Sequence, residues 1–162
     1  MKKTKKKPEK PPVKLFVMLC DGMTTTPAWL ASSCSARIYY LYLKSLLNRA
    51  KPEENNGEVF ISQRDAAKAI GVTRSVIQRV HLEVIHFGFV VETSPGRMGT
   101  DGRGRAPHLR LTELPTKDGA ATKDYLNWDG TPFTPPKWRR PRKSYGLENS
   151  PPRTGKQSIR MA

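Results

Sequence analysis

The chain has 162 residues and a formal net charge of +15, from 29 Lys and Arg against 14 Asp and Glu. This length predicts one domain of ordinary size with short extensions. The apolar run 15–20 is far shorter than the roughly 20 residues of a membrane span and shorter than the apolar core of a signal peptide, so we expect a cytoplasmic protein with neither. Cys20 and Cys34 stand apart without a CxxC motif or a nearby histidine, which predicts no disulfide or zinc site. We expect both to be small buried residues.

The excess positive charge lies in two tails. Residues 1–14 carry a net charge of +6 and residues 132–162 carry +7, whereas residues 15–131 carry only +2. Nine of the 14 prolines fall in the same tails, and such polar, Pro-rich segments bury too little apolar surface to fold alone. We therefore expect a basic disordered N-terminal arm (1–14), a folded domain (15–131) and a Pro-rich basic C-terminal tail (132–162).

The first elements expected in the folded domain are mainly helical. The run 15–20 suits a short strand or an anchoring segment, and 26–30 suits a short helical turn. Residues 36–50 carry apolar side chains at three- and four-residue spacing, which predicts an amphipathic helix capped by Ser33 or Ser35. After a loop, residues 58–61 are typical of a brief strand.

Two capped helices are predicted next. Ser62 is placed to cap a helix that ends at Gly71, and Thr73 is placed to cap a second helix that runs to about Phe87 and ends at Gly88. Only a short link separates the two helices. A tight turn of this kind makes the helices cross at a large angle, so that the second projects from the body of the domain.

Strand-like residues then surround a glycine-rich loop. Residues 89–93 are β-branched and aromatic, residues 108–114 alternate polar and apolar, and the loop 94–107 between them contains four glycines. These patterns predict a hairpin with a flexible tip, and a short helix at 122–128 that closes the domain. The complete order is that of an α+β winged helix-turn-helix, with a three-helix core and a β-hairpin wing.

The second capped helix has one apolar and one polar face. At 100° per residue its predicted buried stripe contains Val76, Ile77, Val80, Val84 and Phe87. The opposite side of the first two turns carries the residues that we expect to contact DNA bases in the major groove: Arg74, Ser75, Gln78 and Arg79. Arginine can pair with guanine O6 and N7, and glutamine with adenine N6 and N7.

Other residues are expected to contact the DNA backbone. Helix N-termini suit phosphate oxygens, which indicates Ser62, Arg64 and Thr73. The glycine-rich loop can follow a groove closely, and its arginines suit phosphates or a narrow minor groove; the expected wing contacts are Arg97, Arg103, Arg105 and Arg110. Leu82 and Ile85 are apolar yet lie opposite the buried stripe, so we expect them to meet a second subunit or a folded-back tail.

No pattern in the sequence predicts catalysis. His81, His86 and His108 lack metal-ligand spacing with acids or cysteines. The glycine-rich run 96–104 is not followed by Lys-Ser/Thr and precedes a strand, so it is not a phosphate-binding loop. We expect no enzyme activity, no metal, no cofactor and no small-molecule ligand.

Several stretches match a known type of protein: TPAW (26–29), SAR (35–37), NNG (55–57), SQRDAA (62–67), GVT (71–73), FGFV (87–90) and LRLTEL (109–114). Over about residues 15–128 the chain resembles the winged-helix proteins of bacterial phages, prophages and mobile elements, especially those of alphaproteobacteria. The resemblance implies a DNA-binding module of the transcription-regulator or replication-associated type. It places recognition-helix positions at Thr73, Arg74, Ser75, Gln78 and Arg79. The sequence departs from this pattern at Leu82 and Ile85, where such proteins are usually polar.

We therefore expect sequence-specific binding of double-stranded DNA by a nucleoid-associated transcriptional regulator. The tails would neutralise phosphates, which raises affinity and steepens its salt dependence without reading sequence. A homodimer on a palindromic site remains open. Three alternatives also remain: an accessory factor in replication or recombination of a mobile element, a winged-helix module that binds a protein partner through Leu82 and Ile85, and an RNA-binding protein that uses its basic tails.

Overall fold

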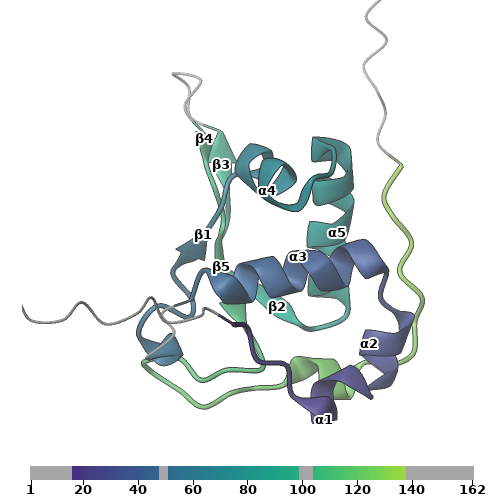
Figure 1. The fold of residues 1–162 in the computed structure, drawn as a ribbon, viewed down its shortest axis with the longest axis vertical. Coiled ribbons are helices and arrows are strands. Elements are labelled where there is room, and N and C mark those ends of the chain that lie inside the picture. Colours follow the sequence, from purple (N-terminus) through teal and green to yellow (C-terminus); the bar gives the residue numbers. More distant parts are fainter. Residues whose placement is uncertain (1–15, 48–50, 99–103, 138–162) are drawn as a thin grey trace, which may run out of the picture.

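The computed structural model of the chain describes residues 16–47, 51–98 and 104–137, and it is an α+β fold (Figure 1). Its helices are α1 (Asp21–Thr24), α2 (Pro27–Ala31), α3 (Cys34–Ser45), α4 (Gln63–Ile70) and α5 (Arg74–His86). Two short 3₁₀ turns are η1 (Pro52–Glu54) and η2 (Asp124–Asn127). The strands are β1 (Val59–Phe60), β2 (Val90–Ser94), β3 (Arg97–Met98), β4 (Gly104–Arg105) and β5 (His108–Leu111). Both predicted tails, apart from residues 132–137, and the loop tip 99–103 lie outside the described residues.

Side-chain caps begin the three main helices, as the sequence predicts. The Ser33 hydroxyl accepts from the Ala36 N–H to start α3, so Ser33 rather than Ser35 is the cap. Ser62 caps α4 and Thr73 caps α5 in the same way, each accepting from the N–H three residues on. Gly71, at φ +72°, takes the left-handed conformation that ends α4. The paired capped helices are therefore confirmed.

The sheet has the order β1-β5-β2 and is antiparallel throughout. The pairs Val59↔Leu109 and Val90↔Leu111 direct apolar side chains from all three strands to the same face. The predicted hairpin of the two longer strands is confirmed. The loop between them is more ordered than we predicted, because β3 and β4 extend it as a two-stranded ribbon up to the tip.

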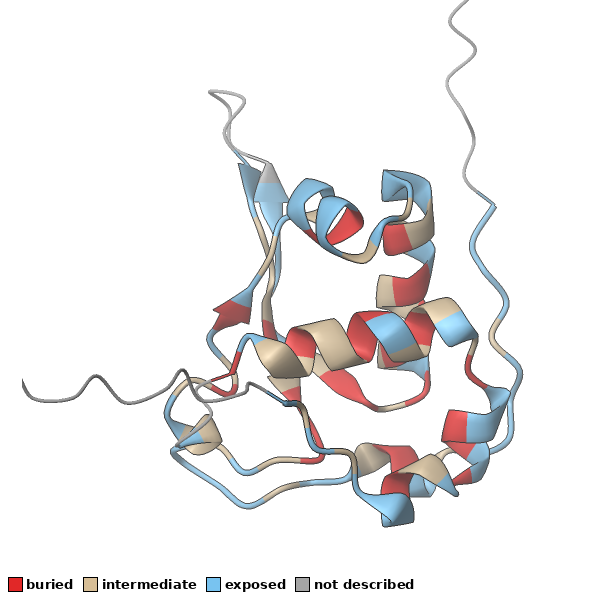
Figure 2. Cartoon of the chain, in the orientation of Figure 1, coloured by how far each residue is buried: buried red, intermediate tan, exposed pale blue. Residues whose placement is uncertain are grey.

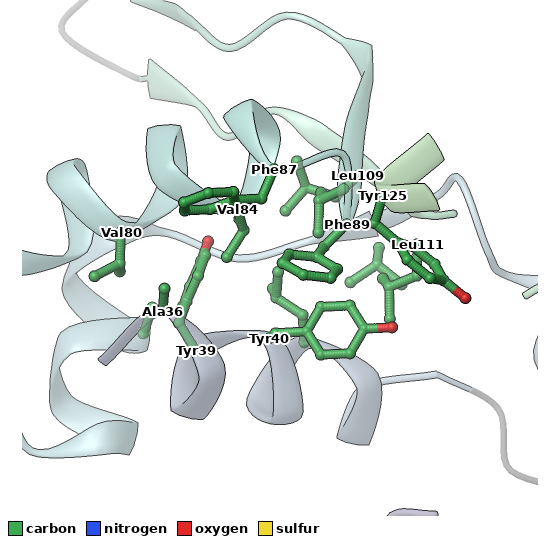
Figure 3. Packing of buried hydrophobic residues seen from close by; sticks show 14 of the residues in the cluster. Ala36, Tyr39, Tyr40, Val80, Val84, Phe87, Phe89, Leu109, Leu111 and Tyr125 are labelled. Atoms are coloured by element: carbon green, nitrogen blue, oxygen red, sulfur yellow. The ribbon is translucent and has the colours of Figure 1, made fainter. Parts of the chain in front are cut away.

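The core lies between this face of the sheet and the helices α3 and α5 (Figures 2 and 3). Tyr39 and Tyr40 of α3 point toward Phe87 and Phe89, and Trp29 of α2 packs edge-on against both Tyr40 and Phe89. Of the predicted stripe on α5, Val76 is half-buried and four residues are buried: Ile77, Val80, Val84 and Phe87.

Three predictions about the N-terminal part are wrong or need revision. Both cysteines are exposed, because Cys20 lies in irregular chain just before α1 and Cys34 is the first residue of α3. Residues 16–20 form no strand. Helix α3 ends at Ser45, five residues before the predicted end.

The C-terminal part of the domain packs on the end of α5. Tyr125 of η2 stacks on Phe89, Trp128 meets Phe87 edge-on, and Phe133 lies against His86 at 5.6 Å between ring centroids. The His86 Nε2 and the Thr131 carbonyl oxygen are 2.8 Å apart. Packing by the folded domain therefore extends beyond the predicted boundary at residue 131.

Candidate nucleic-acid interface

The two helices α4 and α5 pack against each other through small residues. Ala66 and Ala67 of α4 are buried, and their short side chains let α5 approach closely. The turn at Gly71 to Thr73 then directs α5 away from α4, and the first residues of α5 are left at the surface. The start of α5 is therefore held by a rigid scaffold but remains accessible.

The four residues expected to contact bases lie on this accessible part of α5. Arg74, Ser75 and Arg79 are exposed, and Gln78 is half-buried. Two of the four thus add positive charge to the first two turns. The 13 residues of α5 make a helix about 20 Å long, enough to lie along a major groove.

The residues expected to contact the DNA backbone are exposed, but two of them already serve as caps. The Ser62 hydroxyl donates to Asp65 Oδ2 at 2.6 Å while it accepts from the Asp65 N–H. The Thr73 hydroxyl accepts from the Val76 N–H at 3.4 Å. Arg64, in the first turn of α4, is exposed. The N-terminal ends of α4 and α5 can therefore bind a phosphate through the charge of Arg64 and through the free N–H groups of their first turns.

The ribbon carries two arginines directly opposite each other. Arg97 of β3 pairs with Arg105 of β4, and both side chains are exposed. Directly opposed residues project from the same face with Cβ atoms about 5 Å apart, where like charges destabilise the pair. Neither arginine takes part in the ion pairs formed within the described residues. The ribbon is therefore a concentrated positive site with no internal counter-charge among those residues.

The other two predicted wing arginines are placed differently. Arg110 lies five residues from Arg105 on β5, opposite Val91, and is not brought together with the ribbon pair. Its Nη2 lies 3.9 Å from Asp124 Oδ2, so an acid of η2 already faces its charge. Arg103 lies outside the described residues.

The ribbon, α4 and the start of α5 lie at one end of the molecule, and α1, α2 and η2 lie at the other (Figure 1). Most residues of this end are exposed or half-buried (Figure 2). Its exposed basic residues come from three elements: Arg64 and Lys68 of α4, Arg74 and Arg79 of α5, and Arg97 and Arg105 of the ribbon. We call these six residues the basic end. Such an arrangement can bind a polyanion along a curved or grooved surface.

Polar contacts, most of them part-buried, that the sequence does not indicate fix the direction of α5. Glu83 is 5% exposed; its carboxylate accepts from the Ser33 N–H at 2.6 Å and from the Ser33 hydroxyl at 3.0 Å, at the start of α3. His81 lies between the Tyr39 hydroxyl and the Glu92 carboxylate, at 3.2 and 2.8 Å. These contacts fasten α5 to α3 and β2, behind the exposed face.

Leu82 and Ile85 are both half-buried. This leaves less of their surface accessible to a partner than the predicted position opposite the buried stripe implies.

A second polar cluster lies away from the basic end. Glu113 Oε2 accepts from the Tyr40 hydroxyl and from Lys44 Nζ, each at 2.6 Å. Burial, and then the Glu113 charge, raise the pKa of Tyr40 well above its usual value of 10. A hydrogen bond to Glu113 raises the pKa of the Cys20 thiol. These groups join α3 to the segment after β5 and act structurally.

An open cleft of about 370 Å³ lies between the C-terminal end of α5 and the chain around η2. Its lining combines aromatic and acidic residues, including His86, Trp128, Asp124 and Asp129. Within the described ranges, no three His, Cys, Asp or Glu side chains gather as a metal site, and no helix has the length and apolar character needed to cross a membrane.

No protein-family model, curated protein sequence or solved structure matches this chain.

Proposed function

We propose that the chain is a winged helix-turn-helix protein that binds double-stranded DNA by sequence and regulates transcription. In this proposal α4 and α5 are the helix-turn-helix pair, α5 is the recognition helix, and the β3–β4 ribbon is the wing. The predicted element order and the short turn between two capped helices support it.

One observation carries the proposal furthest: the opposed arginines of the ribbon lie at the same end of the molecule as the exposed arginines of α5 (Figure 1). Like charges directly opposite each other cost stability in the free protein. That cost is offset when an anion lies between or beside the two guanidinium groups, and phosphate accepts hydrogen bonds from both. A DNA backbone supplies such anions at regular spacing.

The division of roles follows from chemistry. Arg74, Ser75, Gln78 and Arg79 would contact bases, because their side chains lie on the accessible first two turns of α5. Arg97 and Arg105, together with Arg64 and the first-turn amides of α4 and α5, would contact phosphates or the minor groove. Arg110 is left out of this set because Asp124 faces it. The basic tails, mostly outside the described residues, would add sequence-independent affinity.

Selection from a random duplex library tests the proposal. The full chain is used at about 0.15 M salt, where binding through phosphates alone is weakened. We expect an enriched motif, whose symmetry would distinguish a monomer from a dimer. A matched selection with Arg74→Ala should lose preference at particular positions of that motif. No enrichment, with binding that disappears as salt rises, would contradict sequence-specific recognition.

The same selection followed by genomic mapping separates the regulator from an accessory factor in replication or recombination. Motif occurrences at promoters, with a change in transcript level when the protein is removed, are expected for a regulator. Occurrences confined to one origin or attachment site would favour the accessory role.

A further inference from the structure

Arg74 is held by a specific hydrogen bond in the free protein. Its Nε donates to the Gln63 side-chain oxygen Oε1 at 3.1 Å. Gln63 is the first residue of α4 and Arg74 is the first residue of α5, so the bond joins the starts of the two helices across the tight turn. A guanidinium only donates, and the amide oxygen is the only acceptor of a glutamine side chain. The bond therefore fixes the orientation of the Gln63 amide as well as that of Arg74.

The bond occupies Nε and leaves the outer edge of the guanidinium free. Arginine has five N–H donors, of which four belong to the two Nη groups. The Arg74 guanidinium forms no other hydrogen bond or ion pair with the described residues. Guanine presents O6 and N7 as two adjacent acceptors in the major groove, and a fixed guanidinium edge can pair with both.

Arg79 provides a contrast on the same face. Its side chain is exposed like that of Arg74, but its guanidinium forms no hydrogen bond or ion pair with the described residues. A free arginine side chain loses rotamer freedom when it binds a base. One that is already held by a hydrogen bond loses less, and its guanidinium approaches the base in fewer orientations. Of the two arginines, Arg74 is therefore the one that can discriminate sharply between bases.

We propose that Gln63 is a positioning residue that holds Arg74 for the recognition of guanine at one base pair of the target. This inference rests on the proposed function and names the base that one of its contacts selects. Gln63 need not touch that base. Its role is to supply a single acceptor at the point where the start of α4 meets the start of α5.

The test compares two duplexes with the full chain. One duplex carries the motif selected by the wild-type chain. The other differs from it at a single position, where a guanine that the wild-type chain prefers, and Arg74→Ala does not, is replaced by another base. Arg74→Ala should lower discrimination at that position about 5- to 150-fold, the value of a bidentate arginine–guanine pair. Gln63→Ala should lower it about three- to tenfold, because one orienting hydrogen bond is lost. Gln63→Glu keeps an acceptor for Nε and should retain the discrimination.

Arg64→Ala is the matched variant, because Arg64 follows Gln63 on the same turn of α4. It should weaken binding to both duplexes equally and lower the log–log salt slope by about 0.9. A second measurement needs no DNA. In the free chain, the Arg74 Nε–H proton should exchange with water more slowly in the wild type than in Gln63→Ala, with circular dichroism confirming that each variant is folded.

The outcomes separate this inference from the proposed function. Full discrimination by Gln63→Ala, or unchanged Nε–H exchange, would overturn the positioning role while leaving a DNA-binding protein in place. A motif that persists in full with Arg74→Ala would also overturn it. If the wild-type chain selects no motif, the proposed function fails and this inference fails with it.

Discussion

Reversing one charge of the ribbon should stabilise the protein and abolish much of its DNA binding. In Arg97→Glu a carboxylate would lie opposite Arg105, so that a repulsive pair becomes an attractive one. Cross-strand charge pairs contribute about 0.2–1 kcal/mol, so replacing repulsion by attraction should stabilise the ribbon by about 0.5–1 kcal/mol. That gain corresponds to about two- to fivefold greater protection of the ribbon amides in native-state hydrogen exchange.

The same substitution removes one phosphate contact and engages Arg105, which weakens a second. Hydrogen bonds to charged groups contribute about 1.5–3 kcal/mol each, so the loss of one should lower DNA affinity at least about tenfold, and the weakening of the second should lower it further. The log–log salt slope should fall by up to about 1.8. Fluorescence anisotropy with a labelled duplex over a range of salt concentrations measures both quantities.

Lys117→Glu is the control for net charge. Lys117 is exposed in the turn between Thr116 and Gly119, beyond β5, and the substitution changes the formal charge by the same amount. It should alter affinity far less than Arg97→Glu. The reasoning is refuted if Arg97→Glu lowers ribbon protection and leaves the salt slope unchanged, or if both variants weaken binding equally.

Three further predictions concern the fold and the tails. Gly88→Ala places a Cβ 2.8 Å from backbone atoms of η2 at φ +74°, so it should lower the free energy of unfolding by at least about 2 kcal/mol and the melting temperature by roughly 8 °C or more. Gly22→Ala is the control, because no atom lies near its Cβ and its melting temperature should change little. Equal shifts of the two variants in a thermal melt would contradict this account. The raised pKa of Tyr40 means that the folded state keeps a proton which the unfolded state loses, so its stabilising contribution is complete below pH 10 and falls by about 1.4 kcal/mol per pH unit above it. Urea unfolding of Tyr40→Phe between pH 9 and 11.5 should therefore show a shallower decline than the wild type, and parallel curves would count against this cause. Truncation to 16–137, which keeps the packed Phe133, should lower the salt slope of DNA binding and leave the selected motif unchanged; loss of the motif would overturn the assignment of base reading to the folded domain.

The sequence predicts well those features that depend on neighbours in the chain. Ser62 and Thr73 cap their helices through the N–H three residues on, and Gly71 ends a helix through its own backbone conformation. Each of these signals is local, so its pattern is visible without the fold. The hairpin is predictable for the same reason, because each of its two strands has a local pattern: residues 89–93 are β-branched and aromatic, and residues 108–114 alternate polar and apolar.

Contacts between distant residues were not predictable. Nothing in the sequence near Glu83 indicates that its carboxylate will accept a hydrogen bond from Ser33, 50 residues earlier. Arg110 looked equivalent to the ribbon arginines, and only the packing of η2 brings Asp124 to it. Both cysteines are exposed although their residue type favours burial, and Cys34 lies on the exposed side of its helix start.

Mapping the DNA-contacting residues of the full chain by nuclear magnetic resonance is the most direct test of the central claim. The isotope-labelled protein would be titrated with a duplex of about 20 base pairs at about 0.15 M salt. We predict that amide shifts change mainly at 62–64, 73–79 and 97–105, and remain small in α1, α2 and η2. Changes confined to residues 1–15 and 138–162, or centred on the end that carries η2, would contradict recognition by α5 and the ribbon.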